Sequence, residues 1–453
     1  MVISKQLWIP AGVYPDCSVG AGMTNIKMKR ILIFSTAYLP LVGGAEIAVK
    51  ELTDRLAGFS AHLPAEASAQ AGGGPASGWE FDLICARIKK DLVKQEKIGR
   101  ITVYRVGLGC KSDKFLLPWL GVRAALKLHK INKYDLIWAI MASFGGLAAL
   151  FFKKKNSKVP YLLTLQEGDT PEHIYSRAKW LGSYYKKMFT GADFITVISR
   201  YLKNFALEQG AAAPIEIVPN GVDIKHFTRE YKIENLIALK SKLGKLEKDK
   251  FIITTSRLVL KNAVDDVIKA LEYLPDNIKF LILGVGPDEN SLKLLVKNLK
   301  LENRVLFLGQ INQADLPKYL AVADIFIRPS LSEGLGISFL EAMAAGLPVI
   351  ATPVGGIVDF LRDLSAGSGQ ATGLFCKVNN PESIAEKVKI YLGNKELTEK
   401  IKINAKEMVI KNYNWDLIAK KMEGIFNKVT CHCERPSANW RRSEAISRIT
   451  SWH

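Results

Sequence analysis

The sequence has few of the residues that build metal centres or disulfide frameworks. Its 453 residues include six cysteines, and these are scattered along the chain. Cys431-His432-Cys433 brings ligand types together, but the spacing is wrong for a zinc knuckle and a second ligand pair is missing. We therefore expect free thiols, a reducing cytoplasmic location and no bound metal.

Long hydrophobic runs are also scarce. One uncharged run, Leu136 to Phe152, approaches the length of a membrane span, but Gly145 and Gly146 interrupt it. A buried parallel strand followed by a packed helix explains this run better than a membrane span does.

Sequence signals for nucleic acid or a dinucleotide cofactor are missing. No zinc-finger spacing, RNA-binding motif or helix-turn-helix pattern accompanies the net charge of +19, so an anionic substrate or anionic lipid fits that charge better. Gly284-Val285-Gly286 begins like a dinucleotide fingerprint, but Glu289 occupies the third glycine position. We therefore expect neither a nucleic-acid partner nor a cofactor.

The length of the chain suggests two domains, and its alternating strand and helix patterns predict an α/β fold with parallel sheets. The turn formed by Pro219, Asn220 and Gly221 separates the halves. We expect the following division: an extension at 1–29, a first domain at 30–218 with a flexible insertion at 59–79, a linker at 219–223, a second domain at 224–411, a closing helix at 412–428 and a tail at 429–453, with the extension, insertion and tail disordered.

The stretch from Pro329 to Gly356 carries the strongest functional signal. It predicts a strand, a glycine loop with Gly334 and Gly336, and a helix starting near Ile337. The unpaired amides at the helix start suit a phosphate. Glu333 in the loop and Glu341 on the helix can then accept hydrogen bonds from sugar hydroxyls on both sides of a diphosphate, although two solvated glutamates on an ordinary strand–loop–helix unit are the alternative.

This stretch resembles the retaining glycosyltransferases of family 4, which have the GT-B fold of two Rossmann-like domains with parallel sheets facing a central cleft. The resemblance rests on the two glutamates, on Gly-Leu-Gly after the first, and on Glu-Ala-Met-Ala-Ala-Gly-Leu-Pro-Val-Ile from the second. It covers roughly residues 30–428. It implies that Glu333 contacts the donor sugar, that Glu341 holds the ribose hydroxyls, and that the amides of Gly334, Leu335 and Gly336 meet the sugar and the diphosphate.

Two cations lie at a predicted strand–helix junction in the second half. Arg257 and Lys261 are four residues apart, and they either face one diphosphate or are solvated surface charges. The resemblance implies that both bind the donor diphosphate. Ala263 stands where the family usually has glycine, which leaves the start of the local helix in question.

Three further segments match the family. The resemblance implies that a loop with Gly43 and Gly44 closes over the donor at the start of a helix. It also implies that Gln310 and Ile311 belong to a segment whose backbone reads the nucleobase. We add Gly284, at a strand end, to the expected donor site.

A polar loop follows the predicted strand at 161–165. Gln166 occupies the place where the family commonly has a histidine near the donor sugar. Glutamine can form a hydrogen bond with a hydroxyl group but cannot titrate. Asp169 is our preferred group for positioning an acceptor hydroxyl, with Glu167 and His173 as alternatives. The alternative is that the aspartate and the glutamates only cap the loop.

The sequence therefore predicts an enzyme, a retaining glycosyltransferase that uses a UDP- or GDP-sugar and a glycan or glycolipid acceptor in cell-envelope assembly. The alternatives are a sugar-nucleotide 2-epimerase of the same architecture and a non-catalytic sugar-nucleotide-binding scaffold. The segment from Lys114 to Lys133 mixes apolar and basic residues, so it either lies on an anionic membrane surface or packs on the sheet. The expected location is the cytoplasm, with the inner face of the membrane as a further expectation.

Overall fold

The computed structural model describes residues 28–41, 43–58, 78–366 and 370–431. Most of the extension, the insertion and the tail that we expected to be disordered lies outside these residues. The regular structure extends slightly into each predicted segment, because strands begin at Lys29 and Trp79 and the last helix ends at Thr430.

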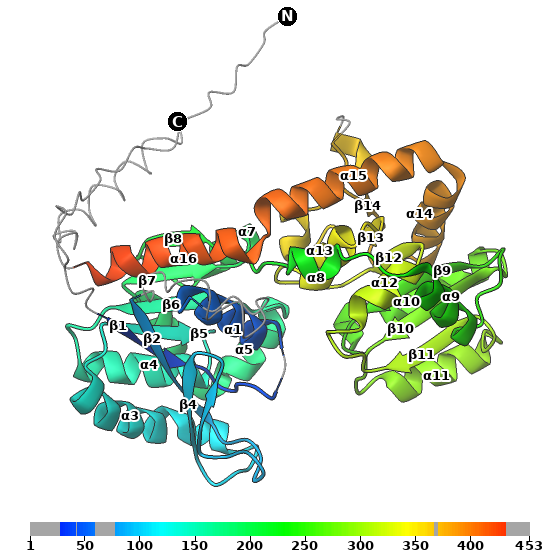
Figure 1. Cartoon of the computed structure of the whole chain (residues 1–453). Coiled ribbons are helices and arrows are strands. Elements are labelled where there is room, and N and C mark those ends of the chain that lie inside the picture. The colour runs from blue at the N-terminus through cyan, green and yellow to red at the C-terminus, as the bar shows by residue number, and fades with distance from the viewer. Residues whose placement is uncertain (1–27, 42, 59–77, 367–369, 432–453) are drawn as a thin grey trace, which may run out of the picture.

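The first half is built on an eight-stranded sheet with the order β3-β4-β2-β1-β5-β6-β7-β8 (Figure 1). All its neighbours are parallel except the β3–β4 pair. The strands are β1 (Lys29–Phe34), β2 (Trp79–Ala86), β3 (Gln95–Ile98), β4 (Ile101–Val106), β5 (Leu136–Ile140), β6 (Tyr161–Leu165), β7 (Phe194–Val197) and β8 (Ile215–Ile217). The sequence did not predict β3, because this edge strand has one apolar residue and leaves its side chains partly or fully exposed.

Alternate residues of β1 build two separate cores, as the pleat of a strand requires. Ile31 and Ile33 pack in the layer of α1 (Gly44–Leu56) and α16 (Trp415–Thr430). Leu32 and Phe34 pack in the layer of α3 (Asp113–Asn132) and α4 (Phe144–Lys155). The other helices of this half are α5 (Pro171–Ala178), η1 (Lys179–Leu181), α6 (Tyr184–Thr190) and α7 (Arg200–Glu208).

The uncharged run from Leu136 to Phe152 is a buried strand followed by a packed helix, as predicted. Every residue of β5 is buried. A Cβ on Gly145 would lie 2.8 Å from the carbonyl carbon of Ser35, so glycine lets α4 start against the end of β1. None of the described helices is both long and apolar enough to cross a membrane.

The second half contains a fully parallel six-stranded sheet with the order β11-β10-β9-β12-β13-β14. Its strands are β9 (Lys250–Thr255), β10 (Ile278–Leu283), β11 (Val305–Gly309), β12 (Ile325–Arg328), β13 (Val349–Ala351) and β14 (Leu374–Phe375). Its helices are α8 (Ile224–Phe227), α9 (Ile233–Lys242), η2 (Leu260–Asn262), α10 (Val264–Ala270), η3 (Leu271–Tyr273), α11 (Glu289–Asn298), α12 (Leu316–Val322), α13 (Ile337–Ala344), η4 (Gly355–Asp359), η5 (Leu364–Ala366), α14 (Pro381–Gly393) and α15 (Lys395–Asn412).

The helix α16 leaves the second half and packs on the first (Figure 1). Its Phe426 lies with its ring 5.2 Å from that of Trp138 in β5. At the crossing, the N–H of Val222 donates to the carbonyl of Tyr413 at 2.7 Å, and a Cβ on Gly221 would lie 2.7 Å from the ring of Trp415. The predicted linker therefore packs against the segment that begins the closing helix.

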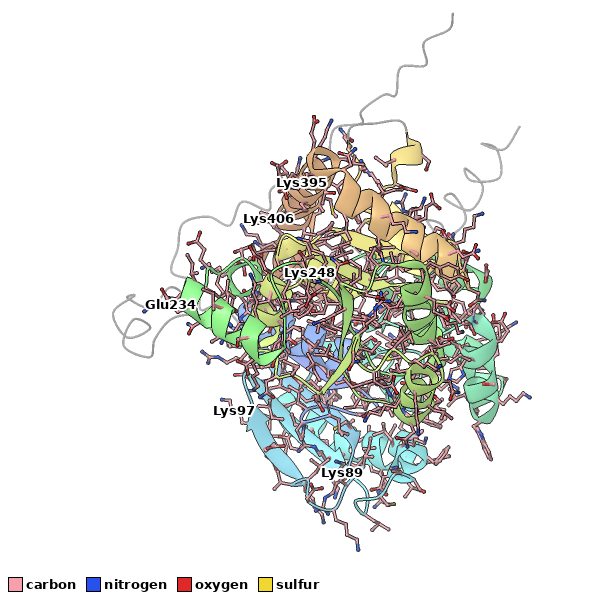
Figure 2. The ribbon with its side chains drawn as sticks, turned by 90° about the vertical axis from the view of Figure 1, so that its right-hand side faces the viewer. Lys89, Lys97, Glu234, Lys248, Lys395 and Lys406 are labelled. Carbon is pink, nitrogen blue, oxygen red and sulfur yellow. The ribbon has the colours of Figure 1, made fainter. Side chains whose placement is uncertain are left out.

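Charged side chains stand on the outside of both halves. Figure 2 labels Lys97 of β3 in the first half, and Lys248, Lys395 and Lys406 in the second half, together with Glu234 of α9. The lysines that the view labels come from both halves of the molecule.

Candidate active site between the two halves

Lys261 connects the second half of the molecule to the first. It lies in η2, the short turn between β9 and α10. Its Nζ donates to the carbonyl oxygen of Gly168 at 2.8 Å and to Oδ1 of Asp169 at 2.9 Å. Its own carbonyl accepts from the N–H of Leu331 at 2.7 Å, so the lysine also adjoins the loop after β12.

Glu333 reaches the same place as Lys261. A Cβ built on Gly168 would lie 3.5 Å from both Oε1 of Glu333 and Nζ of Lys261. Oε1 accepts from the N–H of Gly334 at 3.1 Å. The structure thus brings together an acidic and a basic group that are far apart in the sequence, as the sequence predicted for one ligand.

Backbone groups of the two halves touch directly beside these side chains. A Cβ on Gly334 would lie only 2.4 Å from the carbonyl oxygen of Glu167, so a side chain there would push the halves apart. The hydroxyl of Ser332 donates to the carbonyl of Gly168 at 3.2 Å. The loop after β12 therefore fits against the loop after β6.

Two helix N-termini point into this region. Gly336, with φ of 91°, precedes α13 and takes a conformation that favours glycine, while its neighbour Leu335 is buried. Gly43 precedes α1, and a Cβ on Gly44 would lie 3.5 Å from Cδ1 of Ile337. Because helix N-termini carry partial positive charge, their approach favours an anion between the halves.

A carboxylate already lies at the start of α1. The site where a Cβ on Gly43 would sit is 2.5 Å from Oε2 of Glu46. Burial raises the pKa of Glu46, while hydrogen bonds from the backbone at Glu46 and Gly43 oppose the rise. The amides at the start of α1 are therefore already hydrogen-bonded to the carboxylate of Glu46.

Glu341 lies on α13 and is only partly exposed. Its Oε1 accepts from Nε2 of Gln313 at 2.9 Å. Burial raises the pKa of Glu341 to about 7, opposed by the hydrogen bond from Gln313 and by the charge of Arg328. The carboxyl group is therefore set to exchange a proton near neutral pH.

The loop after β6 has a buried acidic anchor. Glu167 accepts from the N–H groups of Ala142 at 2.8 Å and Gln166 at 2.9 Å, and burial raises its pKa. The side-chain oxygen of Gln166 accepts from Nδ2 of Asn220 at 3.0 Å. Glu167 therefore anchors the loop from inside, and Gln166 is held by the linker.

Of the three candidates for positioning an acceptor hydroxyl, Asp169 contacts Lys261 directly. Its Oδ2 is 3.9 Å from Nε2 of His173, and its Oδ1 contacts Lys261. The side chain of His173 is 58% exposed, so this histidine lies at the outer edge of the site.

The Arg257 side chain is exposed and takes part in no hydrogen bond or ion pair within the described residues, so its role beside Lys261 stays a prediction. One predicted feature differs from the structure. The helix expected after β9 is first a 3-10 turn, and α10 begins only after Ala263, whose φ is 47°. The family glycine fits this left-handed conformation better than alanine does.

The predicted nucleobase segment lies at the end of β11. Gln310 is exposed and Ile311 is half-buried. The N–H of Gly284 donates to the carbonyl of Gly309 at 2.7 Å, which brings the ends of β10 and β11 together.

Sequence analysis missed Arg328 and Gln313. Arg328 ends β12 and its Nη2 donates to Oε2 of Glu333. A charged residue inside an otherwise apolar strand was the available signal for Arg328, whereas nothing near Gln313 indicated its contact with Glu341. The described residues contain no cluster of three potential metal-ligating side chains.

This arrangement has the chemistry to bind a phosphorylated, hydroxyl-rich ligand. Lys261 and the helix N-termini offer positive charge, while Glu333 and Glu341 offer acceptors for hydroxyl groups. The contacts between the loops bring these groups within one region.

Two family models match the chain. That of the "Glycosyl transferases group 1" matches residues 237–408, and that of "Glycosyltransferase Family 4" matches residues 70–226. Each match falls mainly within one half of the molecule.

Individual proteins match over most of the chain. A GDP-mannose-dependent alpha-(1-6)-phosphatidylinositol monomannoside mannosyltransferase from Mycobacterium tuberculosis is 26% identical over 87% of this chain and 97% of its own. An alpha-monoglucosyldiacylglycerol synthase from Acholeplasma laidlawii is 27% identical over 88% of this chain and 96% of its own. The solved structure of HepE from Anabaena with UDP and glucose has a TM-score of 0.69 at 18% identity, covering 88% of this chain and 99% of HepE.

Proposed function

We propose, from the premise that this chain is a GT-B glycosyltransferase of group 1 and family 4, that it moves a sugar from a nucleotide-diphosphate sugar to a hydroxyl group of a glycan or glycolipid with retention of configuration. The observation that carries this proposal is the meeting of Lys261, Glu333 and the Gly168 backbone between the halves. It supports a site in which one ligand touches both halves.

The leaving diphosphate gains negative charge as its bond to the sugar breaks. Lys261 and the N-terminal amides of α13 would stabilise that charge, and Glu333 would hold the donor sugar. Arg257, which is exposed, would join them. Attack from the same face as the leaving group would retain the configuration, with the leaving phosphate accepting the proton of the acceptor hydroxyl.

The relatives favour a lipid-linked acceptor. The name of the mannosyltransferase gives a phosphatidylinositol monomannoside as its acceptor, and the name of the synthase gives a monoglucosyldiacylglycerol as its product. The mannosyltransferase depends on GDP-mannose, and HepE was solved with UDP. A UDP- or GDP-sugar donor and a glycolipid acceptor of the cell envelope therefore form our working assignment.

An exposed apolar patch supports a membrane-bound acceptor. It consists of Phe115, Leu116 and Trp119 on α3 and Trp180 on η1, with Trp119 63% and Trp180 80% exposed. The rings of Phe115 and Trp180 lie 6.1 Å apart, and Nζ of Lys114 lies 5.0 Å from the Phe115 ring. Aromatic side chains beside lysines are typical of surfaces that bind anionic bilayers.

The patch also follows the C-terminal ends of strands of the first sheet, where the loop of Asp169 lies. The helix α3 follows the C-terminal end of β4, and Trp180 follows the loop of Asp169 through α5. α3 packs through Leu117, Val122 and Ala125 in the core, which leaves the patch on another face of the same helix for the proposed membrane contact. We propose on this basis that the protein binds a membrane surface, at its inner face.

A donor panel tests the proposal. UDP-, GDP- and ADP-sugars are incubated with the protein and anionic vesicles that contain diacylglycerol, monoglycosyldiacylglycerol or phosphatidylinositol monomannoside, with and without EDTA. We expect one donor to release nucleoside diphosphate with an EDTA-resistant rate and the anomeric configuration to be retained. Lys261→Ala and Glu333→Ala should abolish turnover, while Lys293→Ala and Glu289→Ala, a paired lysine and glutamate on α11, should not.

Three results would contradict parts of this assignment. Inversion at the anomeric carbon would rule out the retaining mechanism. Conversion of the donor to its epimer without an acceptor would indicate an epimerase. Binding of a donor without nucleoside diphosphate release in the presence of every acceptor would favour a non-catalytic scaffold.

A further inference from the structure

Arg328 is a buried cation beneath the candidate donor site. It is the last residue of β12 and is 7% exposed. Its Nε donates to the hydroxyl of Ser330 at 3.1 Å, and its Nη1 donates to the hydroxyl of Ser338 at 2.7 Å. Its Nη2 donates to Oε2 of Glu333. All three nitrogens of the guanidinium are therefore engaged.

An aromatic ring also restrains the plane of this guanidinium. Its central carbon lies 4.4 Å from the centre of the Phe339 ring, in a cation–π contact. Ser338 and Phe339 belong to the first turn of α13, whereas Ser330 and Glu333 belong to the loop before it. One side chain thus ties the loop and the start of the helix together.

The two carboxylate oxygens of Glu333 have different partners. Oε2 receives the guanidinium, while Oε1 receives the Gly334 N–H and faces the space next to Gly168 and Lys261. Without the guanidinium, the carboxylate would be free to rotate about its terminal torsion, which has a broad energy profile. A buried charge is costly unless it is paired, so each partner of this pair constrains the other.

We propose that Arg328 is a positioning residue, which holds Glu333 so that Oε1 faces the donor sugar and locks the first turn of α13 to the same carboxylate. This inference rests on the proposed role of Glu333 in donor binding. Arg328 acts through Glu333 and does not itself touch the sugar. Lysine in its place would keep the charge but lose the fork that reaches three acceptors at once.

A double-mutant cycle in the full-length protein separates positioning from a merely structural role. Arg328→Met should lower kcat about 100-fold, as expected when a binding group is misplaced, with a smaller change in KM. Arg328→Lys should recover part of this loss. In a Glu333→Gln background, Arg328→Met should cause little additional loss, because the two residues act as one unit.

Arg304→Met is the matched control. Arg304 lies just before β11, is half-buried and donates from its guanidinium to the carbonyls of Leu274, Pro275 and Ile278. Its loss should lower the melting temperature and leave kcat unchanged. If Arg328→Met kept the wild-type kcat, or if its loss simply added to that of Glu333→Gln, the proposal would be overturned.

A crystal structure of Arg328→Met gives a readout that does not depend on activity. We expect the Glu333 carboxylate to leave its position beside Gly168. An unmoved carboxylate would refute the positioning role even if turnover fell. If the wild-type protein consumed no nucleotide sugar, the proposed function would fail, and the crystal structure would still decide whether Arg328 positions Glu333.

Discussion

Nζ of Lys261 lies 2.9 Å from Oδ1 of Asp169, and this ion pair joins the second half of the molecule to the first. The lysine is 34% exposed and the aspartate 28%, so water reaches the pair and weakens it. A diphosphate bound to Lys261 would compete with the Asp169 carboxylate for the same ammonium group. Donor binding and the contact between the halves are therefore linked in our proposal.

Asp169→Asn should strengthen donor binding while slowing transfer. Removing the carboxylate removes an anion that competes with the diphosphate, and we expect donor affinity to rise about fivefold, or about 1 kcal/mol. The kcat for transfer should fall, because Asp169 is our candidate for positioning the acceptor hydroxyl. Calorimetry with the donor and steady-state kinetics measure the two effects separately.

The control for this substitution is Asp265→Asn, which breaks an ion pair with Lys269 on α10. It should change neither quantity. Weaker donor binding by Asp169→Asn would mean that the carboxylate helps to hold the donor instead of competing with it.

Binding of the nucleoside diphosphate should depend on the protonation of Glu341. Burial raises the pKa of this carboxyl to about 7, and only the ionised form offers both oxygens as acceptors to the ribose hydroxyls. Affinity should therefore rise as the pH increases from 6 to 8. Calorimetry in buffers of different ionisation enthalpy should detect release of a proton, and Glu341→Gln should abolish the contribution of this group.

The same carboxyl has an opposite effect on stability. Its pKa is higher in the folded protein than in the unfolded chain, so the folded state binds the proton more tightly and loses stability as the pH rises from about 4.5 to above 7. Glu341→Gln should remove this loss and make the protein more stable than wild type at pH 8. A denaturation series that gave equal stability changes with pH in both proteins would contradict the assignment.

Ala263→Gly should leave stability nearly unchanged. Ala263 is buried and has φ of 47°, which costs alanine about 1–2 kcal/mol and glycine little. That gain offsets the loss of the buried methyl group and the added freedom of the unfolded chain. Urea denaturation should show a change within about 0.5 kcal/mol.

Ala148→Gly is the matched control, because Ala148 is equally buried but lies inside the regular helix α4. It should cost about 2 kcal/mol from helix propensity and the lost methyl group together. Equal losses at the two positions would show that the left-handed conformation of Ala263 carries no penalty.

The apolar patch should bind anionic vesicles. Trp119→Ser and Trp180→Ser should each weaken binding to phosphatidylglycerol-containing vesicles about 10- to 100-fold, since burying an apolar side chain contributes about 1.5–3 kcal/mol. Added salt should weaken binding further by screening Lys114 and its basic neighbours. Vesicle sedimentation measures both effects.

Ile233→Ser tests whether any exposed apolar residue would behave this way. Ile233 is 71% exposed on α9 in the second half, so its substitution should not affect sedimentation. If wild type bound pure phosphatidylcholine vesicles as well as anionic ones, the role of the lysines would be excluded.

The sequence by itself determined every strand of the described residues except β3, together with the glycine loops, and it singled out Glu333, Glu341 and Lys261 as candidates. Buried parallel strands appear as apolar runs, and loops that approach another backbone closely need glycine, so both leave local signals. The alternation of these signals also determined the α/β class. Local pattern could not predict β3, because a mostly exposed edge strand needs little apolar sequence.

Only the tertiary structure decided which groups meet. It brought Lys261 to Gly168 and Asp169, and it linked Arg328 to Glu333 and Gln313 to Glu341. The contacts of Lys261 depend on how the two halves pack, because residues more than ninety positions apart leave no local signal of their approach. Arg328 and Glu333 are five positions apart, and Gln313 and Glu341 are 28 apart, but the folded loop and helix decide which of these side chains meet. The same packing buries Glu341 and so sets its pKa, which no spacing in the sequence reveals.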